Sequence, residues 1–335
     1  MGRSKRAFVT LSIVAAVGCS STPPPQDPVL TADPPVGGAE GLASGTANTE
    51  VQRATEYITN QKFEEAKKHL ESALAEKPDH PRANYLMAMT MQTLGDKAGA
   101  ETYFKKSLAL DPSQNNCTTD LGALYLEDPA RPDEAIAVLK PAADKAPDSF
   151  DLHTNLAYAY ALKKDYANAS KSYDLAFSKK EDAELRFYYG TILVDANEPA
   201  RAAEQFRKSL AATKDPGLAA KIGHMSGKVG DWSGCASAFD VVIAAKPEAD
   251  FYVRRGLCKH GAKDEPGARA DYEAAAKADP KYATAYYYLG LSYADEKKSR
   301  TSAIAAFEQA AKLGGSSDIG KKAKDKLKEL AKQKP

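Results

Sequence analysis

The sequence predicts an all-α protein made of eight helix pairs stacked into a solenoid. The first observation is a small residue that recurs every 33 to 35 positions along the 335-residue chain. Each is followed 12 or 13 positions later by another small residue, then four positions on by a large apolar residue. Small side chains let two helices approach closely, and residues four apart share a helix face. Such a pair cannot bury its faces alone, so stacking must supply the core.

The eight repeats follow one another without a gap from residue 47 to residue 315. Their first small residues are Ala54, Ala88, Gly122, Ala157, Gly190, Gly223, Gly256 and Gly290. The large apolar residues are Leu70, Phe104, Leu139, Tyr173, Phe206, Phe239, Tyr272 and Phe307. Turn signals are the second observation, because a proline costs least just after a helix ends. Prolines stand at the expected ends of five second helices, at Pro78, Pro112, Pro147, Pro247 and Pro280.

This pattern resembles the tetratricopeptide repeat (TPR), a 34-residue helix pair with small residues at three fixed positions and a large apolar one between them. The tyrosine position of that motif is occupied by Tyr57, Tyr125, Tyr160 and Tyr293. The resemblance covers about four fifths of the chain. It implies a right-handed superhelix whose concave surface, lined by the first helices, binds other proteins.

The N-terminus is typical of an exported lipoprotein. Arg3, Lys5 and Arg6 precede a mostly apolar run over residues 7–17, which is too short to cross a bilayer as a helix. Residues 16–19, Ala-Val-Gly-Cys, resemble the lipobox of bacterial lipoproteins. That resemblance implies cleavage after residue 18 and lipidation of Cys19. The alternative is an ordinary signal peptide whose cleavage site holds a cysteine.

Residues 19–46 are predicted to be a disordered, lipidated tether rich in Pro, Gly, Ser and Thr. Acyl chains on Cys19 would hold it in the lipid bilayer. If the organism is Gram-negative, Ser20 after the cysteine resembles the default signal for the outer membrane. We then expect the repeats to face the periplasm.

Residues 316–335 are predicted to form a C-terminal capping helix. Ile319, Ala323, Leu327 and Leu330 fall on one stripe, which can close the last apolar face of a solenoid. The lysines of this segment are expected on its solvated side. The alternative is contact with anionic lipid or a cell-wall polymer.

Composition argues against several other functions. The formal net charge is +1, which is unlike a dedicated nucleic-acid binder. The four cysteines and five histidines follow no metal-ligand spacing, and no phosphate loop or catalytic motif is present. We therefore expect no nucleic-acid partner, no metal, no cofactor and no catalytic residue.

Eleven residues match first-helix positions that line the concave groove in the resembled family. Aromatic and methionine side chains offer large contact areas, and amides and arginine can hold a peptide backbone or carboxylate. The alternative is that several of them pack against neighbouring repeats. The eleven are Tyr85, Met89, Asn155, Tyr158, Phe187, Tyr188, Lys221, His224, Arg254, Tyr287 and Tyr288.

Cys235 and Cys258 lie on successive helices and could approach one another. In an oxidising compartment they could form a disulfide, which for this loop length would contribute roughly 3 kcal/mol. The alternative is two buried thiols that act as small apolar residues. Trp232, in the turn between the helices of the sixth repeat, is expected to be a packing residue.

These observations predict a membrane-anchored scaffold that binds envelope proteins and is not an enzyme. The resemblance implies roles such as assembly of a pilus or secretion channel, outer-membrane assembly, or regulation of cell-wall enzymes. The alternative is binding of a glycan or cell-wall polymer, in which groove tyrosines stack on sugar rings. Oligomeric state is left open.

Overall fold

The computed structural model describes residues 46–294 and 299–332, and these residues form 17 helices and no strand. The predicted all-helical class, built from helix pairs with a further helix at the C-terminus, is confirmed. The predicted signal peptide, Cys19 and the predicted tether up to residue 45 lie outside the described residues. No described helix is both long enough and apolar enough to span a membrane.

The chain divides into two compact units, residues 1–180 and 181–335, and each holds four helix pairs in its described part. Unit 1 contains α2 (Thr46–Thr59), α3 (Phe63–Glu76), α4 (Pro81–Thr93), α5 (Lys97–Leu110), α6 (Asn115–Leu126), α7 (Pro132–Lys145), α8 (Phe150–Leu162) and α9 (Tyr166–Phe177). Unit 2 contains α10 (Ala183–Asp195), α11 (Pro199–Ala212), α12 (Pro216–Lys228), α13 (Trp232–Ala245), α14 (Ala249–Gly261), α15 (Glu265–Ala278), α16 (Ala283–Ala294), α17 (Arg300–Gly314) and α18 (Asp318–Lys332).

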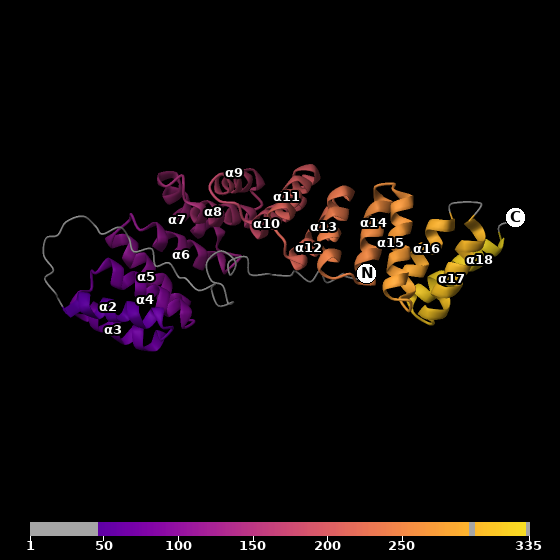
Figure 1. Ribbon diagram of the computed structural model, residues 1–335. Coiled ribbons are helices and arrows are strands. Elements are labelled where there is room, and N and C mark those ends of the chain that lie inside the picture. The colour runs from indigo at the N-terminus through magenta and orange to yellow at the C-terminus, as the bar shows by residue number, and fades with distance from the viewer. Residues whose placement is uncertain (1–45, 295–298, 333–335) are drawn as a thin grey trace, which may run out of the picture. The chain divides into compact units, whose positions relative to one another are not determined.

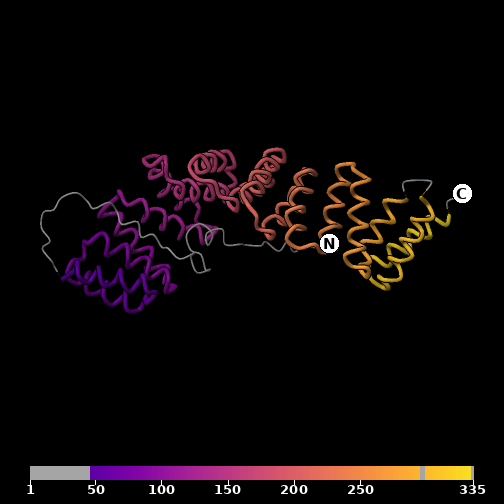
Figure 2. Tube along the Cα trace, in the orientation of Figure 1, coloured from indigo at the N-terminus to yellow at the C-terminus, as the bar shows by residue number. Residues whose placement is uncertain are grey.

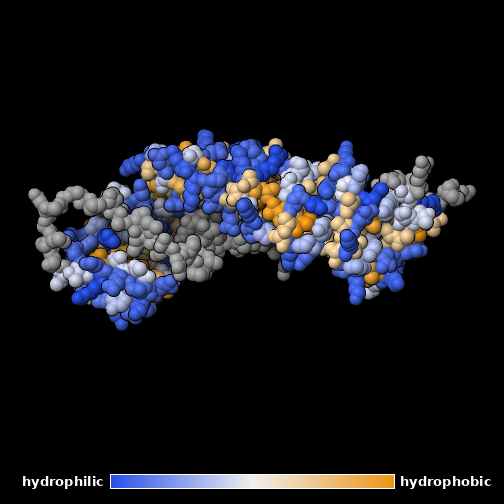
Figure 3. Space-filling view, viewed as in Figure 1, coloured by the Kyte–Doolittle hydropathy of each residue, from blue (hydrophilic) through white to orange (hydrophobic). Residues whose placement is uncertain are grey.

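Within each unit the even-numbered helix of a pair packs on the odd-numbered helix that follows it (Figure 1). The odd-numbered helix then packs on the first helix of the next pair, as the Cα trace in Figure 2 shows for successive repeats. Even-numbered helices from α2 to α16 are therefore the first helices, and odd-numbered ones from α3 to α17 are the second helices. Hydrophilic residues cover most of the visible surface, with apolar patches between them (Figure 3).

The helices begin and end where local chemistry favours it. Asp96, Asp165 and Asp182 each accept a hydrogen bond from a backbone N–H in the first turn of the helix that follows. Pro81 and Pro132 stand at the first helical position, where a proline costs no hydrogen bond. The five predicted turn prolines all follow the last residue of a second helix.

The core of each pair lies between the small residue of the first helix and the large residue of the second. Phe104 is fully buried beside Ala88. At Gly190 an added Cβ atom would lie 2.5 Å from Cε1 of Phe206, so glycine permits this close approach. The residues chosen from the sequence spacing therefore form the helix-to-helix contact.

The last helix, α18, covers the end of unit 2. Ala323 and Leu330 are buried in a cluster with Phe307 of α17, and Leu327 is partly buried against the same cluster. Arg300 of α17 also donates a hydrogen bond from Nη2 to the carbonyl oxygen of Leu330, at 2.5 Å. This packing gives α18 the capping position that its apolar stripe predicts.

Candidate partner-binding surfaces

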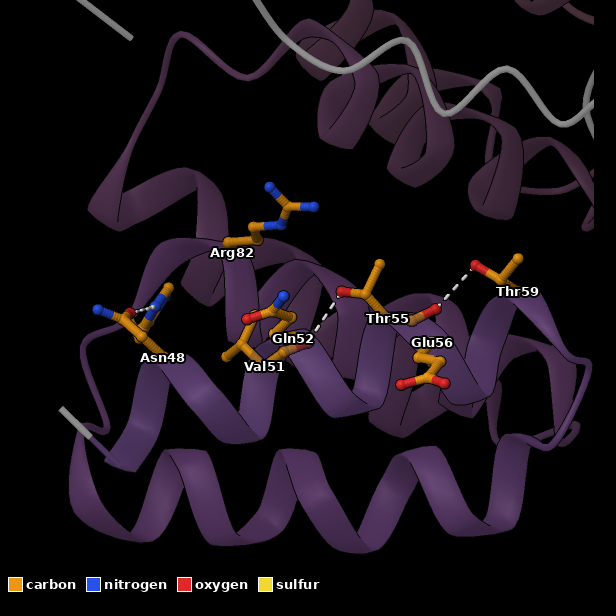
Figure 4. A pocket seen from close by; sticks show the side chains of 8 residues that line it. Asn48, Val51, Gln52, Thr55, Glu56, Thr59 and Arg82 are labelled. Carbon is orange, nitrogen blue, oxygen red and sulfur yellow. Dashed lines mark hydrogen bonds between the residues drawn. The ribbon is translucent and has the colours of Figure 1, made fainter. Parts of the chain in front are cut away.

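The first helices of unit 1 border an open pocket of about 480 Å³ (Figure 4). Figure 4 shows its side chains spaced along α2, with Arg82 extending from the first turn of α4. Open, partly polar recesses of this size can hold a few residues of an extended peptide. The lining residues are Asn48, Val51, Gln52, Thr55, Glu56, Thr59, His80 and Arg82.

Some polar groups of this pocket are used within the fold and others are not. Thr55 donates a hydrogen bond to the carbonyl oxygen of Val51, at 2.8 Å, and Asn48 contacts Nε2 of His80 at 3.0 Å. In contrast, the Gln52 amide and the Arg82 guanidinium make no side-chain hydrogen bond or ion pair with any described residue. An amide can pair with a peptide backbone, and a guanidinium can bind a carboxylate through two parallel hydrogen bonds.

Two acidic residues lie further along unit 1. Tyr85, a predicted groove residue on α4, donates a hydrogen bond to Oδ2 of Asp120 on α6, at 2.8 Å. Burial, together with the nearby negative charge of Asp151, raises the pKa of Asp120 to about 6, although the hydrogen bond from Tyr85 lowers it. Asp120 therefore changes charge close to neutral pH.

The other predicted groove residues of unit 1 differ in exposure. Met89 on α4 and Tyr158 on α8 are half-buried against the core of this unit. Asn155 is only 4% exposed, and its side-chain amide donates to the carbonyl oxygen of Thr119 at 3.3 Å. Asn155 thus bridges α8 to α6, which is the packing role given above as the alternative for part of the predicted set.

In unit 2, the polar and charged residues of the predicted groove are exposed, whereas its aromatic residues are half-buried or buried. Lys221 and His224 on α12 and Arg254 on α14 face solvent. Tyr188, Tyr287 and Tyr288 are half-buried and contact neighbouring rings, Tyr188 edge-on to Phe187.

Aromatic packing decides which side chains of unit 2 are available. Phe187 is 8% exposed, and its ring lies 5.7 Å from that of Phe206. Phe187 therefore packs in the core, which is the alternative given above for part of the predicted set. Tyr288 stacks on Tyr272 with ring centroids 5.6 Å apart, and Tyr287 lies 5.9 Å from Phe307, so both tyrosines expose only part of each ring.

Cys235 and Cys258 form a disulfide between α13 and α14, with their Cα atoms 5.6 Å apart. Both are buried, and so is Cys117, which is a free cysteine. Trp232 lies beside this disulfide and packs on α14, because a Cβ added at Gly261 would come 2.5 Å from Cδ2 of its indole. The structure therefore joins the sixth and seventh repeats covalently and by an aromatic contact.

Comparison with known families now identifies the repeats. One family model, described as a tetratricopeptide repeat, matches residues 57–127, and a second with the same description matches residues 122–179 and 266–318. The chain contains tetratricopeptide repeats. A comparison with curated proteins finds no match.

Solved TPR structures resemble the chain only distantly. MamA from Desulfovibrio magneticus RS-1 is 23% identical over 50% of this chain and 94% of its own, with a TM-score of 0.47. A thermophilic TPR protein from Thermus thermophilus is 24% identical over 53% of this chain and 98% of its own, with a TM-score of 0.41. Pseudomonas aeruginosa pilF is 18% identical over 72% of this chain and 96% of its own, with a TM-score of 0.38. Likenesses this distant carry no partner or pathway over to this chain.

The TPR register could have found the polar residues that sequence reasoning missed. Gln52 and Asp120 each stand two positions before the first small residue of their repeat, as Tyr188, Lys221 and Arg254 do. These positions share one face of every first helix. The predicted groove set consists mainly of aromatic and basic residues, and it therefore does not include Gln52 or Asp120.

Proposed function

We propose that this protein is a membrane-anchored periplasmic TPR scaffold that binds segments of partner proteins along its first helices. The observation that carries the proposal is the pocket between α2 and α4, where Gln52 and Arg82 have no side-chain partner among the described residues. Polar groups left free beside half-buried side chains are what an extended peptide segment requires. TPR repeats in general are protein-binding scaffolds, which supports the same function.

The cellular setting of the proposal rests on the N-terminal sequence. A charged and apolar leader ending in Ala16-Val17-Gly18-Cys19 supports export and lipidation, with outer-membrane sorting if the cell is Gram-negative. A long tether after Cys19 would let the repeats reach partners away from the bilayer. Assembly or regulation of envelope machinery is the role that fits such a scaffold.

Binding of a glycan or cell-wall polymer is the second candidate. It is favoured by the adjacent half-buried rings of Tyr287 and Tyr288, whose centroids are 5.5 Å apart. However, these rings also pack on Phe307 and Tyr272, which leaves less ring surface for a sugar. Protein binding is therefore proposed first.

In-cell crosslinking followed by purification of the lipidated protein tests the proposal. The wild type is compared with Gln52→Ala plus Arg82→Ala in the pocket, and with Tyr188→Ala on α10. Phe187 is left unchanged, because removing a buried ring would unfold the site. Lys68→Ala plus Glu71→Ala, on the exposed side of α3, is the matched control.

We expect at least one envelope protein to be recovered by the wild type and by the control, and to be lost from a pocket variant. A Cys19→Ser version should recover less of it, because the protein would no longer be held at the membrane. Recovery of the same proteins by every variant would contradict binding through the first helices. Recovery of cell-wall material with the protein, and of no partner protein, would favour the glycan candidate.

A further inference from the structure

Unit 2 carries a compact basic patch, which we define as Lys221 and Lys228 of α12 and Arg254 of α14. The two lysines are seven residues apart and therefore lie on one face of α12. Arg254 occupies in the seventh repeat the position that Lys221 occupies in the sixth, two residues before the first small residue. The patch thus runs across the first helices of two successive repeats.

Little negative charge within the fold offsets this patch. Lys221 and Lys228 are exposed and make no ion pair with any described residue, and α12 contains no acidic residue. Arg254 pairs with Asp250 at 2.6 Å, but Asp250 also accepts a hydrogen bond from the hydroxyl of Tyr282, at 2.9 Å. Three cations therefore face solvent, and among them only Arg254 is paired with a carboxylate of the described residues.

His224, one turn after Lys221 on α12, lies within reach of the charges of Lys228 and Arg254. Burial lowers its pKa, and the positive charges of Lys228 on the same helix and Arg254 on α14 lower it further. His224 is consequently neutral near pH 7. The charge of the patch comes from the lysines and the arginine.

The patch is not a general feature of the first helices. The positions that correspond to Lys221, Lys228 and Arg254 in unit 1 hold no lysine or arginine, and two of them are acidic. They are Gln52, Leu86, Asp120 and Asn155, together with Thr59, Thr93, Glu127 and Leu162. A need for solubility alone would not limit lysine and arginine at these two positions of the repeat to α12 and α14.

An apolar recess adjoins the patch on α14. Leu257, one turn after Arg254, lines a small and mostly apolar cavity of about 80 Å³ together with Tyr272, Tyr288 and Leu291. Its polar lining residues are Ser292 and the pair of His260 and Glu265, whose side chains lie 2.8 Å apart. Polyanions such as sulfated glycans need charge alone, whereas a peptide can place an acidic side chain and an apolar one side by side. The recess therefore favours a protein segment as the occupant.

We infer that the basic patch binds an acidic segment of a partner protein, with an apolar side chain of that segment entering the recess beside Leu257. This inference rests on the proposed function, because it takes the first helices to be a protein-binding surface. It adds the chemistry of the partner: a stretch rich in Asp and Glu that also carries Leu, Ile or Phe.

Selection from a displayed library of random peptides on the full-length chain tests the inference. We expect the enriched peptides to be rich in Asp and Glu with at least one large apolar residue. Their affinity should fall about tenfold or more in Lys221→Glu plus Lys228→Glu, since two attractive charges become repulsive. Lys221→Gln plus Lys228→Gln, a milder change, should lower it less.

Lys277→Glu plus Lys312→Glu is the matched control, because both lysines are exposed in the last turn of second helices of unit 2. It should bind the selected peptides as the wild type does, and circular dichroism should show all three variants folded. Enriched peptides without acidic bias, or with affinity unchanged by the Lys221 and Lys228 variants, would overturn the inference and leave the proposed function standing. Failure to enrich any peptide would count against the proposed function itself. If no acidic peptide is enriched, but dextran sulfate binds and its affinity falls in the Lys221 and Lys228 variants, the patch binds polyanions and the inference is overturned.

Discussion

Single residues set how closely the two helices of a repeat approach. In the repeats that begin with glycine, the large apolar side chain of the second helix occupies the place where a Cβ atom would stand, as Phe206 does at Gly190. In the repeats that begin with alanine, such as that of Ala88 and Phe104, the same contact includes a methyl group. The choice between these two residues therefore adjusts helix spacing one repeat at a time.

Gly190→Val should lower the free energy of unfolding by about 1–3 kcal/mol, because its side chain would overlap the buried ring of Phe206. Thermal or urea unfolding measures the change. Ala200→Val, at an exposed position of α11, is the control and should cost about 0.5 kcal/mol or less. Equal effects of both substitutions would show that the contact at Gly190 is not tight.

Asp120 gives unit 1 a pH dependence that can be isolated by substitution. Its pKa is about 6 in the fold, above its ordinary value of 3.8, so the folded protein binds the proton more tightly. Lowering the pH from 7.5 to 5 should therefore stabilise the wild type, by about 1 kcal/mol from this group. Asp120→Asn lacks this contribution, so the free energy of unfolding of the wild type should rise by about that amount relative to the variant over the same pH range. Parallel pH curves for the two proteins would contradict the raised pKa.

Individual groove residues were harder to predict than the repeats. Core positions follow from spacing, because each contact joins residues of one repeat or its neighbour. Phe187 and Asn155 fit the register of the groove, yet both are buried. The ring of Phe187 lies against Phe206, and the amide of Asn155 donates to a carbonyl oxygen of α6. Gln52 and Arg82 are exposed polar residues of kinds that occur over much of the surface, so residue type alone did not single them out.

Among the elements, α13 and α14 are joined differently from other successive repeats. Their hydrophobic cluster contains the disulfide between Cys235 and Cys258. The sequence left the disulfide and two free thiols as alternatives, because spacing along the chain does not fix the distance between two side chains.

Reduction should lower the stability of unit 2 by about 3 kcal/mol, because the bond limits the freedom of the unfolded chain. Unfolding with and without dithiothreitol measures this effect. Cys117→Ala should respond to the reductant as the wild type does, and Cys235→Ala plus Cys258→Ala should not respond. Free thiols at both positions in unreduced, denatured protein would rule the bond out.

Across the whole molecule, contacts in the described residues join helices that are neighbours or next neighbours in the chain, as expected for stacked repeats. The boundary between the units follows Lys180, where Glu181 takes the place of a turn proline. The repeat spacing could predict the eight pairs, but it does not show how tightly one pair packs against the next. The division into two units was therefore not predicted.

Gly290→Val, which would place a side chain against Phe307, should speed amide hydrogen exchange in α16, α17 and α18 and leave α2–α5 unchanged. Exchange measured by mass spectrometry on peptides from each repeat tests this. Faster exchange throughout the chain would show that the repeats unfold as one cooperative body. Exposed Lys312→Ala is the control and should change no segment.

Trp232 is the chain's one tryptophan, and it lies against Gly261 beside the disulfide. Sulfur close to an excited indole quenches its emission, so breaking this bond or separating the sixth and seventh repeats should alter the protein's own fluorescence. The junction beside the basic patch thus contains a built-in optical reporter. Events at one pair of repeats could be followed in the unlabelled protein.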